Sequence, residues 1–233
     1  MTTVSPEPGQ IFVKICGITS ETDALLAVAL GADGVGFIFA PSPRQMVVSA
    51  VADIVKRLPR EVLTVGVFRD ESPKRTVEIA NAIGLGAVQL HGHETAEECR
   101  WVAERVRCTI KAFPAGDRAI PRFEEFGADY LLIDAESPGS GEVFDWRLAE
   151  GVADHGRLIV SGGLHAGNVG EAIAHLHPFG VDVASGVESR PGQKDPKRLR
   201  EFIVEARRAA ARLAEERGQA PSAPDGPYDW MES

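Results

Sequence analysis

Residues 12–39 read FVKICGITSETDALLAVALGADGVGFIF, and this stretch contains the unit from which the fold is built. Its two short apolar runs, Phe12–Ile15 and Gly34–Phe39, have the length and composition of buried strands. Between them, Glu21–Leu30 has the apolar spacing of a helix, with Thr19 or Ser20 near its start. A strand, a helix and a second strand in this order predict two parallel strands joined by a helical crossover.

The same unit recurs along most of the chain. The strand-like runs are Phe12–Ile15, Gly34–Phe39, Leu63–Phe68, Ala87–Leu90, Thr109–Phe113, Tyr130–Asp134, Leu158–Ser161 and Val181–Ala184. Helical patterns occupy Glu21–Leu30, Ser49–Leu58, Pro73–Ile83, Thr95–Val106, Pro121–Phe126, Trp146–Ala153, Asn168–His175 and Pro196–Glu216. Because eight such units can close into a ring, we predict an α/β protein with a single (β/α)₈ TIM barrel. A doubly wound open sheet shares the alternation, so closure is inferred from the number of units.

The length of 233 residues suits one such barrel, which typically has about 250. We assign residues 11–217 to the barrel and residues 1–10 to an N-terminal leader that lacks the basic and apolar regions of a signal peptide. Residues 218–233 contain three prolines and few apolar side chains, which predicts a disordered C-terminal tail.

The formal net charge of −9 disfavours a nucleic-acid or anionic-membrane surface. No apolar run approaches the roughly 18 residues of a membrane span. The three cysteines, Cys16, Cys99 and Cys108, lack the spacing of a disulfide framework. We therefore expect a cytoplasmic protein whose partner is a small molecule rather than a nucleic acid or a membrane.

Reactive groups of such barrels lie where strands end, at the carboxyl-terminal face. Cys16 ends the first predicted strand, and strand alternation places Lys14 and Cys16 on the same side. If that side is the barrel interior, the cation is expected to favour the thiolate and lower the pKa of the thiol. A thiolate can act as a nucleophile or a general base, whereas the alternative is a small buried apolar residue.

Asp134 ends the sixth predicted strand, after Leu131, Leu132 and Ile133. A carboxyl group there is either catalytic or a loop anchor, and an apolar pocket would raise its pKa and suit it to act as an acid. Cys16 and Asp134 in one site would form an acid–base pair. Which of the two Lys14 accompanies stays open.

Two glycine-rich turns follow the last two predicted strands, at Ser161–Leu164 and Ala184–Glu188. Barrels often bind phosphate between these two loops, because glycine lets backbone N–H groups approach the anion closely. The residues expected to bind phosphate are Gly162, Gly163, Ser185 and Gly186.

Two further features concern charged loops. Arg44 follows Pro41 and Pro43 after the second strand and can grip a carboxylate bidentately, the alternative being a solvated surface arginine. His91 and His93 have a spacing seen in metal sites, but no other His or Cys supports them at a neighbouring strand end, so we expect no metal.

Taken together, these residues resemble the phosphoribosylanthranilate isomerase family of tryptophan biosynthesis. The resemblance covers about residues 11–205 in the family's order. Its motifs are Val13–Gly17, Ser42–Arg44, Gln89–Gly92, Leu132–Asp134, Gly141 through Phe144–Trp146, Ser161–Leu164, and Val181–Asp182 with Ser185–Glu188.

The resemblance implies an intramolecular aldose–ketose isomerase that needs no cofactor. It implies Asp134 as the general acid, Cys16 as the general base and Arg44 as the ligand of the substrate's anthranilate carboxylate. The glycine-rich turns would hold the phosphate, and Asp182 would contact the amino group. The chain could act as a monomer or a homodimer.

Other barrel proteins fit the sequence less well. The related isomerase of histidine biosynthesis is expected to carry a carboxylate where Cys16 stands, and a phosphopentose epimerase needs paired acids with a metal cluster. An indole-forming synthase of the same pathway needs a strand-end lysine, and Lys14 lies too deep. A silent phosphate-binding barrel would not need Cys16, Asp134 and Arg44 together.

Overall fold

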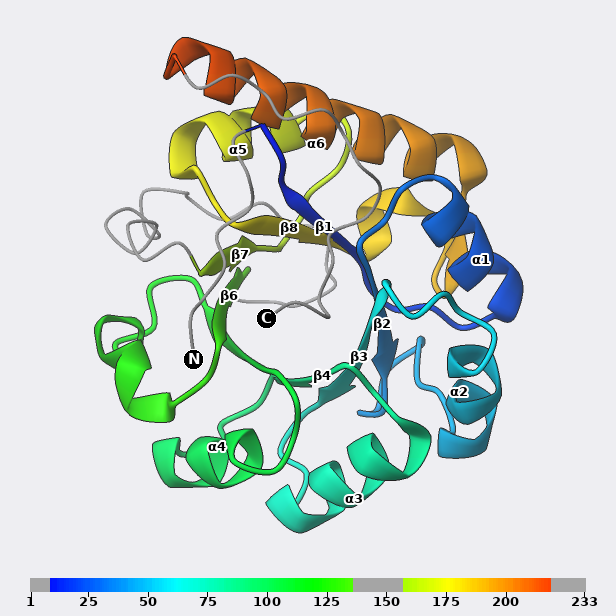
Figure 1. The fold of residues 1–233 in the computed structure, drawn as a ribbon, viewed down its shortest axis with the longest axis vertical. Helices are drawn as coiled ribbons and strands as arrows, with labels where there is room; N and C mark the ends of the chain where they lie inside the picture. The colour runs from blue at the N-terminus through cyan, green and yellow to red at the C-terminus, as the bar shows by residue number, and fades with distance from the viewer. Residues whose placement is uncertain (1–8, 136–156, 219–233) are drawn as a thin grey trace.

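A computed structural model describes residues 9–135 and 157–218, in which eight parallel strands close into one barrel (Figure 1). Each strand pairs with the next along the chain, and β1 pairs with β8 to complete the ring. The strands are β1 Phe12–Ile15, β2 Gly34–Ile38, β3 Leu63–Phe68, β4 Ala87–Leu90, β5 Thr109–Pro114, β6 Tyr130–Asp134, β7 Leu158–Val160 and β8 Gly180–Val183. The predicted (β/α)₈ barrel is confirmed, and the open sheet is excluded.

The helices surround the barrel (Figure 1). They are α1 Glu21–Ala29, α2 Val48–Val55, α3 Pro73–Ile83, α4 Ala96–Ala103, α5 Val169–Leu176 and α6 Pro196–Glu216. Between β5 and β6, the expected helix Pro121–Phe126 is a 3₁₀ segment, η1 Ile120–Phe126, with a kink at Arg122. The expected helix Trp146–Ala153, the motif residues 141–146 and nearly all of the leader and tail lie outside the described residues.

Strand alternation divides the core into two regions. Side chains that point out of the barrel, such as Val13, Ile15 and Ile133, pack against the helices. Those that point inward fill its amino-terminal half with an apolar cluster of Phe12, Leu63, Val65, Ala87, Ile110, Ala112, Tyr130, Leu132, Ile159 and Phe179. Because Phe12 points inward, Lys14 and Cys16 do so too, further along the same strand. The barrel interior is therefore apolar at one end and polar towards the other.

A short antiparallel hairpin follows β8 and was not predicted. The 3₁₀ segment η4, Ser185–Val187, leads into β9, Glu188–Arg190, which pairs with β10, Gln193–Lys194. The hairpin packs on the loop after β1, where the Thr19 hydroxyl donates a hydrogen bond to the Gly192 carbonyl. Its buried side chains Glu188 and Lys194 thereby reach the carboxyl-terminal end of the barrel.

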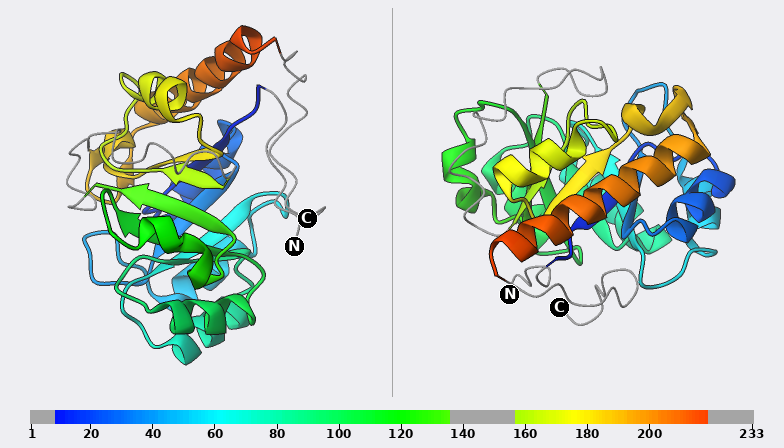
Figure 2. Two further views of the ribbon diagram at one scale, coloured as in Figure 1. Left: turned by 90° about the vertical axis from the view of Figure 1, so that its left-hand side faces the viewer. Right: turned by 90° about the horizontal axis from the view of Figure 1, so that it is seen from above.

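The long helix α6 runs beside α5 along the outside of the barrel (Figure 2). Its Arg207 donates to both carboxylate oxygens of Asp33, at 2.8 and 2.7 Å, and to the carbonyls of Gly31 and Ile11. Asp33 also accepts a hydrogen bond from the Val13 amide at 2.7 Å. Because Asp33 precedes β2, this contact ties the last helix to the amino-terminal face of the barrel, opposite the polar end.

Candidate active site

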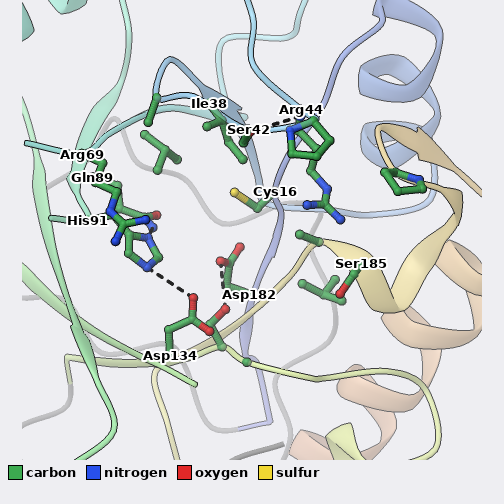
Figure 3. Close-up of a pocket in the computed structure, with 18 of the residues that line it drawn as sticks. Cys16, Ile38, Ser42, Arg44, Arg69, Gln89, His91, Asp134, Asp182 and Ser185 are labelled. Atoms are coloured by element: carbon green, nitrogen blue, oxygen red, sulfur yellow. Dashed lines mark hydrogen bonds and ion pairs between the residues drawn. The ribbon is translucent and has the colours of Figure 1, made fainter. Parts of the chain in front are cut away.

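A cavity of about 550 Å³ opens at the carboxyl-terminal ends of the strands (Figure 3). Every candidate site residue predicted from the sequence lines it except Gly186. Its lining includes Cys16, Arg44, Arg69, Gln89, His91, Asp134, Ser161, Gly162, Gly163, Asp182 and Ser185. The barrel thus brings together residues that are far apart in the chain, such as Cys16 and Ser185, which are separated by 169 positions.

Cys16 and Lys14 point into the barrel from β1. The ammonium group of Lys14, which is fully buried, lies 2.8 Å from a carboxylate oxygen of Asp182. The strand register explains this pair, because Lys14 of β1 lies directly beside Asp182 of β8. On the other side of β1, Gly36 leaves room for the thiol, since a Cβ at Gly36 would lie 2.8 Å from Cys16 Sγ.

The electrostatics of Cys16 correct one expectation. Burial raises the pKa of the Cys16 thiol and outweighs the nearby ammonium groups of Lys14 and Lys194, which act in the opposite direction, while Asp182 reinforces the rise. Burial by itself would lower the pKa of Lys14. The nearby Asp182 and Cys16 outweigh this effect and raise the pKa of Lys14 above its usual value. Lys14 is therefore a permanent cation beside Cys16, although it does not lower the thiol pKa below its ordinary value.

Asp134 lies at the end of β6, with its carboxylate turned into the cavity (Figure 3). One oxygen accepts a hydrogen bond from the backbone amide of Ala135 at 2.8 Å. The other lies 3.3 Å from Nε2 of His91, across the barrel on the β4 side. Asp134 thus acquires a titratable partner that the sequence did not predict.

His91 and Gln89 are site residues that the sequence analysis missed. Nδ1 of His91 lies 2.8 Å from the amide nitrogen of Gln89, and both side chains line the cavity. The signal that could have found them is the alternation that identified Lys14 and Cys16: applied to β4, it turns Ala87, Gln89 and His91 inward together. His93 lies on the surface instead and contacts Asp70 at 3.3 Å.

Asp182 is buried between two partners. Besides Lys14, it accepts a hydrogen bond from the Ser161 hydroxyl at 3.3 Å. Ser161 follows β7, so the contact links the last two strands of the ring. Asp182 is thereby held with its carboxylate at the cavity wall.

Arg44 is not the solvated surface arginine of the alternative interpretation. Its Nε and Nη2 donate to the two carboxylate oxygens of Glu188 at 2.8 and 2.7 Å. Lys194 lies 3.0 Å from the same carboxylate and also donates to the Cys16 carbonyl at 2.6 Å. The bidentate pair uses one edge of the guanidinium, formed by Nε and Nη2, and Arg44 also lines the cavity.

The two glycine-rich turns meet at the cavity. Gly162 and Gly163 adopt left-handed backbone conformations, with φ of 83° and 64°. A Cβ at Gly186 would lie 1.9 Å from the Leu164 carbonyl, so the second turn packs directly against the first. Only glycine allows this approach, which brings Gly162, Gly163 and Ser185 into one wall of the cavity.

Within residues 9–135 and 157–218, no group of three or more His, Cys, Asp or Glu side chains is placed to hold a metal ion. Within the same ranges, no helix is long and apolar enough to cross a bilayer.

Residues 13–205 match the family model described as N-(5′-phosphoribosyl)anthranilate (PRA) isomerase. The N-(5′-phosphoribosyl)anthranilate isomerase of Desulforudis audaxviator strain MP104C is 49% identical over 204 residues, which are 84% of this chain and 98% of that protein.

Solved structures of the same kind are also similar. The phosphoribosylanthranilate isomerase of Thermotoga maritima superposes with a TM-score of 0.78 at 43% identity, covering 84% of this chain and 98% of that one. A phosphoribosylanthranilate isomerase in complex with reduced 1-(o-carboxyphenylamino)-1-deoxyribulose 5-phosphate gives a TM-score of 0.76 at 42% identity, with the same coverage of both chains.

Proposed function

This chain belongs to the N-(5′-phosphoribosyl)anthranilate isomerase family, and we propose that Cys16 and Asp134 perform its reaction as general base and general acid. The reaction is the Amadori rearrangement of N-(5-phosphoribosyl)anthranilate to 1-(2-carboxyphenylamino)-1-deoxyribulose 5-phosphate, a step of tryptophan biosynthesis. The observation that carries the assignment of roles is that a thiol from β1 and a carboxyl group from β6, which are not neighbouring strands, line the same cavity.

Asp134 acts first. In its protonated form it gives a proton to the furanose ring oxygen, the bond from that oxygen to C1 breaks, and the anilino nitrogen supplies the electron pair that forms the iminium ion. Because the nitrogen of the substrate provides these electrons, the step needs no cofactor. The low exposure of Asp134, 5%, keeps water from competing for the proton.

Cys16 acts second. Its thiolate removes the C2 proton of the iminium ion, which yields an enolamine that tautomerises to the ketone. The cation of Lys14 reduces the cost of forming the thiolate, although burial keeps the pKa of the thiol above its ordinary value. Lys194 adds a second positive charge and holds the backbone of Cys16 through its carbonyl.

The remaining residues hold the two anionic ends of the substrate. The ligand of the solved relative carries a carboxyl group on an aromatic ring and a phosphate. Arg44, held by Glu188, is proposed to bind the carboxylate through Nη1, and Gly162, Gly163, Ser185 and Gly186 to provide the phosphate site. Asp182 is proposed to contact the anilino nitrogen. We also propose a cytoplasmic location, which suits three free cysteines.

The test is to add freshly prepared phosphoribosylanthranilate to the purified protein and to follow the loss of its fluorescence. The parent is expected to turn over, whereas Cys16→Ala and Asp134→Asn should each lose roughly 10²–10⁴-fold in kcat. The matched control is Cys108→Ala, which removes a half-buried thiol outside the cavity and should leave kcat unchanged.

The possible outcomes test the identity of the substrate and the role of Cys16 separately. Absence of turnover by the folded parent would remove the assigned function and direct attention to the aminoaldose of histidine biosynthesis. Equal turnover by the parent and Cys16→Ala would keep the substrate and take proton abstraction away from Cys16.

A further inference from the structure

His91 lies where the general acid of the proposed reaction can exchange its proton. Nε2 of His91 is 3.3 Å from the carboxylate of Asp134, while the His91 side chain is 19% exposed and that of Asp134 only 7%. Imidazole gains and loses protons near neutral pH, which is the chemistry of a proton carrier. Among the groups in direct contact with Asp134, His91 is therefore suited to connect the buried carboxyl group with solvent.

Gln89 can support His91 in both protonation states. The amide nitrogen of Gln89 lies 2.8 Å from Nδ1 of His91, where it can donate a hydrogen bond when Nδ1 carries no proton. The amide oxygen of Gln89 is buried and has no hydrogen-bond partner in the described structure. Rotation of the amide by half a turn would present this oxygen to a protonated Nδ1. The orphan oxygen thus matches an imidazolium that forms during turnover.

A second cavity gives His91 its own route to solvent. This cavity, of about 420 Å³, is lined by His91 and Arg69, which also line the first cavity, and by residues after β4 and β5. His91 therefore borders a second cavity besides the one that Asp134 lines, and this cavity can hold water next to the imidazole.

Two charged side chains that line the second cavity, Lys111 and Glu94, are paired with each other. Lys111 and Glu94 form a buried pair at 2.7 Å, and Lys111 also donates to the Gly92 carbonyl at 2.7 Å, which fixes the loop that begins at His91. The titratable or charged groups that line the two cavities with His91 are Cys16, Arg44, Arg69, His93, Glu94, Lys111, Asp117, Asp134 and Asp182. Lys111 and Glu94 are paired with each other, and Asp134 is the carboxylate in direct contact with Nε2 of His91.

Proton balance in the proposed reaction makes such a route necessary. Each turnover takes one proton from Asp134 to the ring oxygen and gives one proton from C2 to Cys16, and the final tautomerisation moves a proton within the product. The enzyme ends with a carboxylate and a thiol, whereas the next cycle needs a carboxylic acid and a thiolate. Asp134 must gain a proton and Cys16 must lose one.

We propose that His91 is the proton relay of Asp134: as an imidazolium it passes the proton on Nε2 to the carboxylate after each turnover, and the neutral imidazole that remains takes a new proton from a hydronium ion in the second cavity. The proton of Cys16 leaves to solvent through the first cavity when the product departs, so the cycle is balanced. His91 acts through Asp134 and is a positioning residue, not a catalytic one. The inference rests on the proposed acid role of Asp134.

The experiment compares two substitutions of His91 with one control. His91→Ala is expected to lower kcat by at least about tenfold with little change in KM, and imidazole added to the buffer should restore turnover in part, because the second cavity can admit it. His91→Gln keeps an N–H group that can face Asp134 but cannot carry a proton, so it should be as slow as His91→Ala and not be rescued. His93→Ala alters an exposed residue of the same loop and should match the parent.

The results distinguish a proton relay at His91 from a purely structural role of this residue. Turnover by His91→Gln near that of the parent, or a folded His91→Ala variant that imidazole does not accelerate, would overturn the relay and leave the proposed function standing. If His91→Ala fails to fold, the His91→Gln comparison decides alone. Inactivity of the parent and of His93→Ala on phosphoribosylanthranilate would instead overturn the proposed function, and the relay with it.

Discussion

At the scale of single residues, Cys16 is held between opposing influences. Burial favours the neutral thiol, and the ammonium groups of Lys14 and Lys194 favour the thiolate. The balance lies on the side of the thiol, so the base must be generated for each cycle. A buried lysine at the base of a site is therefore insufficient evidence for a reactive cysteine.

We predict that the Cys16 thiol of the free enzyme titrates above the free-thiol value of about 8.5. Because its pKa is raised, the thiol persists at neutral pH and the thiolate appears only as the pH rises through that value. The measurement is the thiolate absorbance near 240 nm against pH, with the signal of Cys16→Ser subtracted. Burial raises the pKa of Cys99 to about 12, so Cys99 does not titrate in the pH range in which the Cys16 thiolate is expected to appear. A midpoint below about 8.5 would show that the two lysines outweigh burial.

Gly36 provides a second prediction. Its side chain is a hydrogen atom, and the space beside the Cys16 thiol has no room for a methyl group. A Cβ there would also lie 3.3 Å from Cε of Lys14. Gly36→Ala is expected to displace the sulfur and lower kcat by about 10²-fold, at a cost of about 1–3 kcal/mol in the free energy of unfolding. The measurements are steady-state turnover and urea unfolding.

The matched control for this change is Gly170→Ala in α5, where the nearest atom to the new Cβ is 3.8 Å away. It should leave turnover unchanged and keep stability or improve it by about 0.4–1 kcal/mol. Full activity of Gly36→Ala would mean that the position of the sulfur does not matter for the reaction.

The sequence predicted Lys14 and Cys16 from the alternation of their own strand, missed Gln89 and His91 although β4 carries the same alternation, and could not predict the contacts that form between strands. Alternation along one strand was enough to turn Lys14 and Cys16 inward. The ion pair with Asp182 and the contact of Asp134 with His91 depend on which strands become neighbours across the ring, and the local pattern contains no such information. The sign of the thiol pKa shift was wrong for a related reason, because the degree of burial comes from packing.

At the scale of elements, the β9–β10 hairpin holds two residues of the site in position. Its Glu188 holds Arg44, and its Lys194 holds the carbonyl of Cys16. Strands of three and two residues, with charged and polar side chains, have no apolar pattern, so the sequence analysis could find the Ser185–Glu188 motif but not its structure. The reason for a glutamate at position 188 is visible only in the folded chain.

Glu188→Gln is expected to destabilise the protein by about 3–5 kcal/mol, because it leaves two buried cations, Arg44 and Lys194, without their anion. It should also raise KM more than it lowers kcat, since Arg44 is proposed to hold the substrate carboxylate. Burial alone would raise the pKa of Glu188, but Arg44 and Lys194 together hold it below its usual range. The stabilisation is therefore present above about pH 4.3 and is lost as the pH falls further.

The measurement is urea unfolding at several pH values, together with steady-state kinetics. The control is Glu201→Gln, which removes an exposed partner of Lys197 at 3.8 Å and should change stability by less than about 1 kcal/mol. A stability gap between the parent and Glu188→Gln that persists unchanged well below pH 4 would contradict the assignment of the charge to Glu188.

At the scale of the whole molecule, the two faces of the barrel have different tasks. The carboxyl-terminal face carries the cavities, and the amino-terminal face carries the contact between Arg207 and Asp33. Eight strand–helix units predicted a barrel, but closure depends on the pairing of β1 with β8, whose partners Lys14 and Asp182 are 168 residues apart. The sequence analysis left the partner of Lys14 open between Cys16 and Asp134 and did not identify Asp182 as that partner.

Removal of Arg207 should therefore affect stability and not turnover. Arg207→Met takes the arginine away from the buried Asp33 carboxylate, at a cost of about 3 kcal/mol. For a chain of this length, that loss lowers Tm by about 6–12 °C, measured by calorimetry. Arg208→Met, which removes an exposed partner of Glu205, should lower Tm by less than about 2 °C. A fall in kcat at 25 °C for Arg207→Met would show that the two faces are coupled.

The contact of Arg207 with the Ile11 carbonyl has one more consequence, because it brings the middle of the last helix beside the start of the first strand. In a closed barrel every strand has two neighbours, so the contacts between strands do not require the chain to begin at any particular strand. A circularly permuted chain that joined α6 to β1 through a linker and began at Glu61, in the exposed turn before β3, would bury the same core and form the same cavity. The order of the units along the chain could then change while the barrel and its cavity stay the same.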